Sequence, residues 1–165
     1  MVVWQTDAMR KTFRDESPPQ PLPPPLVIEA ARNEKVAGQF VLWGGEPIRN
    51  LKVVASDLPG PSPHKLSAPR IRYVGYVPVR NKPPPPPLLR PRPCDYPDPL
   101  FDAPPAIVPA RTAQPIWLTF HVPTQVVPGL YEGKIQIEAR VGGEVCRAAL
   151  DIRIRVYAAT LPEKL

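Results

Sequence analysis

Residues 114–157 read QPIWLTFHVPTQVVPGLYEGKIQIEARVGGEVCRAALDIRIRVY and are the most informative part of the chain. Apolar and polar residues alternate in three segments, which are separated by Pro128-Gly129 and Gly142-Gly143. Because successive side chains of a strand point to opposite faces, a period of two predicts strands with one buried and one exposed face. The expected buried parity consists of Ile116, Leu118, Phe120, Val122, Tyr131, Gly133, Ile135, Ile137, Ala139, Leu150, Ile152, Ile154 and Val156.

The composition fits a single domain that is rich in strands. The chain has 165 residues, of which 43% are hydrophobic, and a chain of this length buries roughly two-thirds of its unfolded surface. It contains 28 prolines and 9 glycines. Because proline lacks an amide donor and has a fixed φ, it is excluded from helix interiors and central strands. We therefore expect short strands joined by proline-rich loops.

Other segments with the composition of strands lie upstream. Residues 70–79 are expected at a sheet edge, because Pro78 interrupts them. With the three segments above, the total is about seven or eight strands, which predicts an all-β, antiparallel sandwich that is Ig-like or jelly-roll-like. The upstream segments are residues 2–4, 26–31, 36–43, 51–56 and 70–79.

The chain divides into an N-terminal arm, residues 1–25, and a β-sandwich domain, residues 26–165. Within the arm, residues 8–13 suit either one helical turn capped by Asp7 or a bent, extended path. Residues 17–25 hold six prolines and are expected to be polyproline-like. A second proline-rich segment, residues 81–105, is expected to be a long loop, since nine prolines fall between 81 and 99.

Charge and hydropathy narrow the range of partners. The net charge is +6, but Lys and Arg are scattered and are not interleaved with aromatic residues, so we expect no nucleic-acid binding. No apolar run approaches the length of a membrane span. No signal peptide is visible in this chain, yet an extracellular or cell-surface location suits the composition.

The two cysteines, Cys94 and Cys146, match neither a zinc-site spacing nor a redox motif. A disulfide between them and a pair of free thiols are both compatible with the sequence. No pattern indicates a metal site or a cofactor.

No catalytic residues are predicted. Asp95, Asp98 and Glu34 fall in loops or turns, where carboxylates usually are solvated or cap turns. His64 and His121 have no partner at a recognisable spacing. Nucleophile elbows, phosphate loops and zinc-protease motifs are absent from the sequence.

Aromatic residues support a binding role instead. The parity of Trp117 places its ring on the outer face of the strand, away from the buried residues. On that face the ring could pack against the proline-rich segment or another domain, or stack on a sugar. Tyr96 and Asp98 in the proline-rich segment and Tyr76 complete the candidate surface for a glycan or a domain interface. Pro128 to Gly133 has the pattern of a tyrosine corner built on Tyr131, which is a structural feature.

Seven segments of the chain form an ordered set: Ala31-Arg32-Asn33-Glu34 with Gln39, Val54-Ala55-Ser56-Asp57-Leu58, Arg72-Tyr73-Val74-Gly75-Tyr76-Val77, Tyr96-Pro97-Asp98-Pro99-Leu100, Gln114-Pro115-Ile116-Trp117-Leu118-Thr119 with Val122-Pro123, Pro128-Gly129-Leu130-Tyr131-Glu132-Gly133, and Leu161-Pro162-Glu163. In order and spacing, this set resembles the N-terminal β-sandwich domain that precedes the catalytic barrel in glycoside hydrolase family 123-like proteins. The resemblance implies that N-acetylgalactosaminide-type linkages would be hydrolysed by a following (β/α)₈ barrel with an adjacent Asp-Glu pair. No catalytic position of that barrel maps onto these residues.

The expected function is therefore a non-catalytic accessory module of a carbohydrate-active protein, which packs against a catalytic domain or contacts glycan. The alternative is a self-assembling fibre or cell-surface subunit, a homo-oligomer that associates through its N-terminal arm and proline-rich loop. A third reading is a truncated enzyme whose chemistry lies beyond Leu165.

Overall fold

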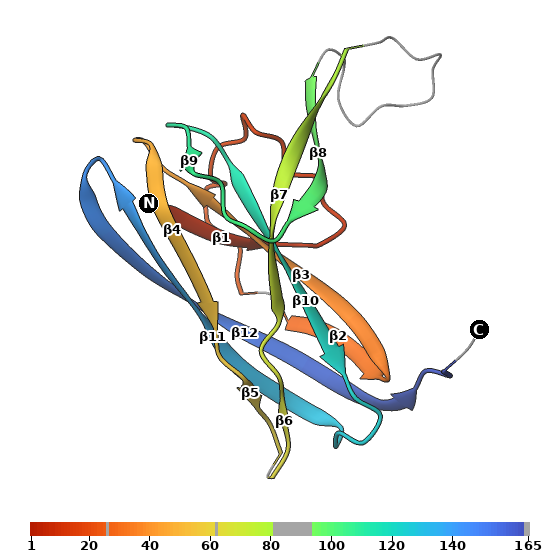
Figure 1. The fold of residues 1–165 in the computed structure, drawn as a ribbon. Helices are drawn as coiled ribbons and strands as arrows, with labels where there is room; N and C mark the ends of the chain where they lie inside the picture. The colour runs from red at the N-terminus through yellow and green to blue at the C-terminus, as the bar shows by residue number, and fades with distance from the viewer. Residues whose placement is uncertain (26, 62, 81–93, 164–165) are drawn as a thin grey trace.

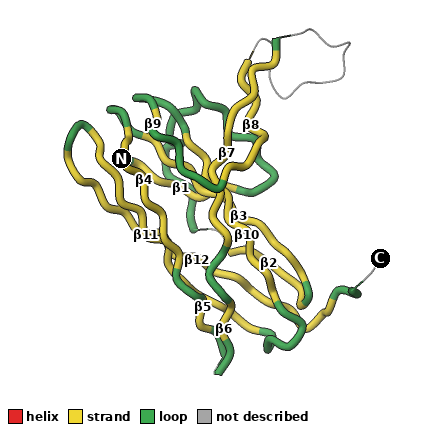
Figure 2. Tube along the Cα trace, viewed as in Figure 1, coloured by secondary structure: helices red, strands yellow, loops and turns green. Residues whose placement is uncertain are grey.

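A computed structural model describes residues 1–25, 27–61, 63–80 and 94–163, and within these ranges it contains strands and loops but no helix (Figures 1 and 2). The predicted all-β class is thus confirmed. It follows that no helix in these ranges is long and apolar enough to cross a membrane. The strands are β1 (Val2–Thr6), β2 (Val27–Arg32), β3 (Glu34–Trp43), β4 (Ile48–Ala55), β5 (Leu58–Pro59), β6 (Lys65–Leu66), β7 (Arg70–Val79), β8 (Cys94–Phe101), β9 (Ile107–Val108), β10 (Gln114–Val122), β11 (Gly129–Val141) and β12 (Glu144–Thr160).

Two five-stranded sheets form a sandwich. The first sheet has the order β1-β3-β10-β7-β8 and the second the order β2-β12-β11-β4-β9, while β5 and β6 make a separate two-stranded ribbon. Neighbouring strands are antiparallel, except that β2 runs parallel to β12. Because β1 pairs with β3 of its own chain, the first residues of the N-terminal arm contribute a strand to the first sheet.

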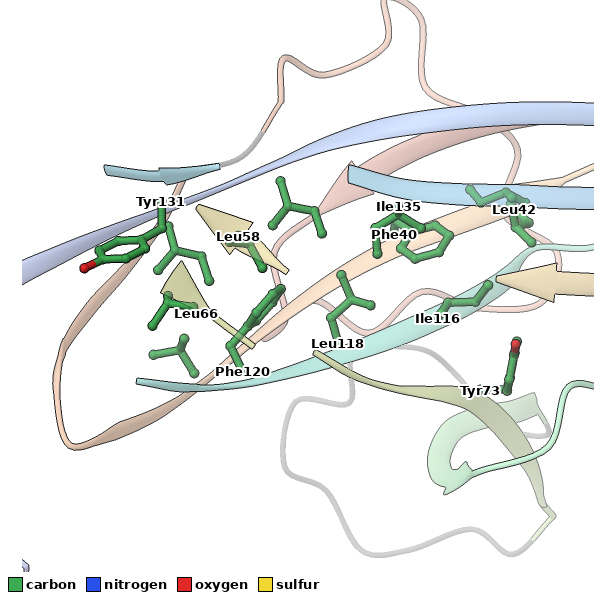
Figure 3. Packing of buried hydrophobic residues seen from close by; sticks show 14 of the residues in the cluster. Phe40, Leu42, Leu58, Leu66, Tyr73, Ile116, Leu118, Phe120, Tyr131 and Ile135 are labelled. Atoms are coloured by element: carbon green, nitrogen blue, oxygen red, sulfur yellow. The ribbon is translucent and has the colours of Figure 1, made fainter. Parts of the chain in front are cut away.

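The core lies between the sheets and uses the parity that the sequence predicts. On β10, Ile116, Leu118 and Phe120 are at most 5% exposed, and on β11, Ile135 is fully buried. Figure 3 shows Ile135 beside Phe40 of β3 and Phe120 near Leu66. Each fully buried side chain of this size stabilises the fold by about 1.5–3 kcal/mol relative to an exposed one. Burial of alternate residues is therefore what holds the two layers together.

The predicted tyrosine corner is present at the start of β11. The Tyr131 hydroxyl donates a hydrogen bond to the Val127 carbonyl at 2.7 Å, and the side chain is fully buried. Gly60 lies against the Tyr131 ring so closely that a Cβ at this position would overlap the ring. The corner therefore needs a residue without a side chain at position 60.

Two expectations about β7 and the segment after it are wrong. β7 is not an edge strand, because it lies between β10 and β8. Pro78 is tolerated because its part of β7 pairs with β8 alone, beyond the end of β10. Of the loop expected over residues 81–105, residues 81–93 lie outside the described residues, and residues 94–101 form β8. β8 is the edge strand of its sheet, which explains how it accommodates Pro97 and Pro99.

In this structure Cys94 and Cys146 are two separate free thiols and do not form the disulfide that the sequence also allows. The reason is the topology: Cys94 opens β8 at the edge of the first sheet, whereas Cys146 lies on β12 in the second sheet, opposite Ala139.

β2 and β3 follow each other in sequence but belong to different sheets. The only residue between them is Asn33, which has a φ of 60°, a left-handed conformation that Asn adopts more readily than most residues. The Asn33 side-chain amide donates to the Leu161 carbonyl at 3.0 Å, and the Leu161 amide donates to the Arg32 carbonyl at 2.9 Å. This turn therefore also holds the segment that follows β12.

Candidate ligand-binding groove

After β1, the N-terminal arm turns and lies against the outer face of the first sheet, close to β7 and β8 (red in Figure 1). A turn forms at Asp7, whose carboxylate accepts a hydrogen bond from the Met9 amide at 2.6 Å while its carbonyl accepts one from the Arg10 amide at 3.1 Å. Of the two paths expected for residues 8–13, the structure therefore has the bent arm rather than a helical turn.

The sheet holds the arm through hydrogen bonds to the arm's backbone. From β3, the Gln39 side-chain amide donates to the Arg10 carbonyl at 3.1 Å. Next to β10, the Ala113 amide donates to the Arg14 carbonyl at 2.8 Å. Gln39 is only 6% exposed, so its amide needs such a partner. These contacts make the arm part of the sandwich surface.

Tyr76 and Tyr96, two of the predicted binding residues, pack against the arm. The Tyr76 hydroxyl donates to the Ala113 carbonyl at 2.9 Å, and the Arg14 guanidinium lies 4.6 Å from the centre of the Tyr76 ring. Burial raises the pKa of Tyr76 well above its usual range, so the phenol stays neutral. The ring of Tyr96 contacts the buried ring of Phe13. Both tyrosines therefore serve to hold the arm in place.

Trp117 lines a groove between the arm and β8, with a volume of about 270 Å³. Trp117 pairs with Gln39 of β3 and with Arg72 of β7, so it lies at the centre of the outer face. Its side chain is partly buried, as its predicted outward parity requires. The lining consists of residues 8–12 of the arm together with Gln39, Val74, Pro97, Asp98, Leu100 and Trp117.

An ion pair joins the two walls of the groove. The Lys11 ammonium of the arm donates to the Asp98 carboxylate at 3.2 Å and to the Pro97 carbonyl at 3.1 Å. The side chains of Lys11 and Asp98 are 43% and 74% exposed, so solvent weakens the pair. Its effect is to place a charged donor and a charged acceptor at the edge of the groove.

One buried polar atom among the residues that line the groove lacks a partner in the described part of the chain. Thr12 is only 2% exposed, and its hydroxyl makes no hydrogen bond in the part of the chain that the structure describes. An unsatisfied buried hydroxyl costs about 1–3 kcal/mol, and water or a ligand commonly supplies the missing partner.

The buried polar side chains of the described residues are Thr6, Thr12, Gln39 and Gln114, none of which titrates near neutral pH. The same described residues include no group of three or more His, Cys, Asp and Glu side chains that could hold a metal ion.

The carboxylates with shifted pKa values lie elsewhere on the surface. Hydrogen bonds from Lys65 and Lys134 lower the pKa of Asp57 and Asp151, respectively, which keeps both carboxylates ionised. The groove itself presents an aromatic ring, Trp117, and the charged groups of Lys11 and Asp98.

Of the four predicted binding residues, Trp117 and Asp98 meet in the groove, whereas Tyr96 and Tyr76 lie against the arm. Lys11, Thr12 and Met9 were not predicted as site residues. No sequence signal marks them, because only the fold of the arm places them opposite β8.

The fold is a β-sandwich, and a family model indicates a module associated with glycoside hydrolases. The model of the glycoside hydrolase 123 N-terminal domain matches residues 10–139, and the chain belongs to this family. The match begins within the N-terminal arm, which is consistent with the arm packing on the sheet.

Among solved structures, a family 123 glycoside hydrolase from Clostridium perfringens, studied for glycolipid glycan hydrolysis, has a TM-score of 0.65 and 17% sequence identity. The alignment covers 83% of this chain and 23% of that enzyme, so the chain corresponds to under a quarter of the enzyme's length. A PapD-like domain of human CEP192 aligns over 87% of this chain and 96% of its own, at 12% identity and a TM-score of 0.37. None of the curated proteins matches the chain.

Proposed function

We propose that this domain is a non-catalytic accessory module that works beside the catalytic domain of a glycoside hydrolase. The observation that carries the proposal is the polar content of its interior. Most glycosidases use two carboxyl groups that flank the bond to be cleaved, and the general acid commonly has a raised pKa. The buried polar side chains among the described residues are instead threonines and glutamines.

The end of β12 supports a fixed attachment for a neighbouring domain. The Arg32 guanidinium donates to the Ala158 carbonyl at 2.7 Å, and the hydrogen bonds between Leu161 and the Asn33 turn follow directly. A catalytic domain joined to this segment would lie close to the sandwich rather than on a loose tether. Near this end, the outer face of the second sheet exposes Tyr157 and Leu130, which are 45% and 41% exposed and suit contact with a partner.

The first test is the gene context, followed by a binding measurement. We expect a family 123 catalytic barrel to be encoded in the same reading frame or in an adjacent gene. That catalytic domain should bind the 165-residue chain, and Tyr157→Ala should weaken the binding by about tenfold, the effect of a contact of about 1.4 kcal/mol. Val145→Ala, at the other end of the same sheet, is the matched control and should bind normally.

A chromogenic N-acetylgalactosaminide assay tests the non-catalytic part of the proposal. The purified chain alone should not hydrolyse this substrate. If the chain does hydrolyse the substrate, and if Asp95→Asn or Asp98→Asn abolishes this hydrolysis, the proposal is overturned. An extracellular or cell-surface location is expected for a module of this kind, and cell fractionation tests it. The self-assembling alternative also stays a prediction, which sizing chromatography tests.

A further inference from the structure

We propose that the Trp117 groove binds one pyranose ring of a glycan. This inference rests on the proposed accessory function and adds the ligand class to it. Three features of the groove carry the inference: its size, the aromatic ring in its lining and the polar groups at its edge. Its volume of about 270 Å³ is near the lower end of small-molecule sites, about 300–1,000 Å³, which suits a single sugar ring better than a long oligosaccharide.

The Trp117 ring supplies the apolar half of the recognition. A pyranose carries C–H bonds on its faces and hydroxyls around its rim, so an aromatic ring can cover one face while the rim stays available for hydrogen bonds. Trp117 lies on the central strand of the first sheet, between Gln39 of β3 and Arg72 of β7. Met9, on the arm, is 89% exposed and adds a flexible apolar side chain to the same groove.

The polar contacts to the sugar would come from the two walls of the groove, the arm and β8. Lys11 has three donor hydrogens and uses two of them, on Pro97 and Asp98. The hydrogen bond from Lys11 engages Oδ1 of Asp98, and among the described residues Oδ2 makes no hydrogen bond. The groove therefore offers donors and acceptors that sugar hydroxyls can satisfy.

The same polar groups argue against an apolar side chain of a neighbouring domain as the occupant. Such a side chain would exclude water from Lys11 and Asp98 without replacing its hydrogen bonds, and burying polar groups without new partners is unfavourable. A sugar hydroxyl both donates and accepts, so it can replace the displaced water. A pyranose is thus the occupant that matches the apolar and the polar parts of the lining together.

Fluorine NMR of the chain labelled with 5-fluorotryptophan tests the inference directly. The chain has three tryptophans, and Trp4, which is only 4% exposed, is an internal control. The probes are methyl β-galactopyranoside, its 2-acetamido analogue and methyl β-glucopyranoside, with glycerol as a non-cyclic control. We expect at least one glycoside to shift the Trp117 resonance saturably at millimolar concentration, while the Trp4 resonance and the glycerol titration show no change. Trp117→Phe assigns the resonance.

Matched variants locate the binding in the groove. Asp98→Asn should weaken binding about three- to tenfold, the effect of losing a hydrogen bond to a charged group. Asp102→Asn, an equally exposed acid that pairs with Arg70 away from the groove, should bind like the unaltered chain. Trp117→Leu should abolish detectable binding, followed by amide chemical shifts, which also report whether the variant is folded.

The inference is overturned if no glycoside moves the Trp117 resonance, if all three tryptophans shift alike, or if Asp98→Asn binds unchanged. Loss of this inference leaves the accessory role intact when the catalytic domain still binds the chain. Conversely, sugar binding without any catalytic partner would leave the groove assignment standing and remove the accessory role.

Discussion

The ring of Phe13 meets the ring of Tyr96 edge-on, with the ring centres 5.4 Å apart and the ring planes at 74°. This contact joins the N-terminal arm to β8 on the outer face of the first sheet. Aromatic pairs of this geometry contribute about 0.5–1.5 kcal/mol beyond the apolar area that they bury.

We therefore expect Phe13→Ala to release the arm. The side chain is 6% exposed, and removing a buried phenyl group costs about 3–5 kcal/mol. Denaturant unfolding measures the loss of stability, and trypsin cleavage at Arg10 and Lys11 should become faster. Met9→Ala is the control within the arm: Met9 is 89% exposed, so its removal should change stability by less than about 0.5 kcal/mol. Equal cleavage of the two variants would contradict the observed packing.

Gly60→Ala should destabilise the domain, because the new methyl group would overlap the fully buried ring of Tyr131. Overpacking of this kind costs about 1–3 kcal/mol. Gly45→Ala is the matched control, since a Cβ there has no neighbour within 4 Å. Thermal unfolding of both variants measures the difference. If Gly60→Ala unfolds at the same temperature as Gly45→Ala, the tyrosine corner is not closed as described.

Adjacent residues on β10 test the two-layer arrangement. Phe120 is 1% exposed and belongs to the core, while His121 is exposed on the opposite face. We expect Phe120→Ala to cost about 3–5 kcal/mol of unfolding free energy and His121→Ala less than about 0.5 kcal/mol. Urea denaturation followed by circular dichroism measures both values. The reverse order of effects would rule out the register of β10.

Asp57 is expected to titrate below the usual range of an aspartate. A hydrogen bond from Lys65 at 2.7 Å is the main cause, and the Ala68 amide adds a second. Because the pKa is lower in the folded state, the stabilisation is present above the pKa of the unfolded chain, near 4, and is lost as the pH falls through the lower folded value. Carboxyl carbon NMR measures the titration.

Lys65→Met should move the Asp57 titration toward the ordinary range. Lys134→Met, which removes the partner of Asp151, should leave Asp57 unchanged. A normal Asp57 titration in the unaltered chain would show that this surface pair does not form in solution.

The strands that could be predicted from sequence are those with a regular period. β10, β11 and β12 alternate between core and solvent, and apart from Gln114 and Pro115 at the start of β10 their buried residues are the ones that the pattern indicates. β5, β6 and β9 have two residues each, too few to show a period. β8 was not predicted, because it contains Pro97 and Pro99, and proline argues against a strand unless the strand is known to lie at an edge.

The groove was predictable only in part. The outward parity of Trp117 follows from its strand, but the wall opposite β8 comes from an arm about a hundred residues away in sequence. Residues 8–12 have no apolar period, and backbone carbonyls accept several of the bonds that hold the arm. Every residue type carries such a carbonyl, so residue identities do not reveal this contact.

The parallel pairing of β2 with β12 has a consequence for biosynthesis. A ribosome releases Val27–Arg32 long before Glu144–Thr160, so the early strand has no neighbour in its sheet while the intervening hundred or so residues are made. A nascent chain can therefore complete the second sheet only after translation of its final strand, and until then the backbone groups of Val27–Arg32 that later bond to that strand have no partner in the sheet.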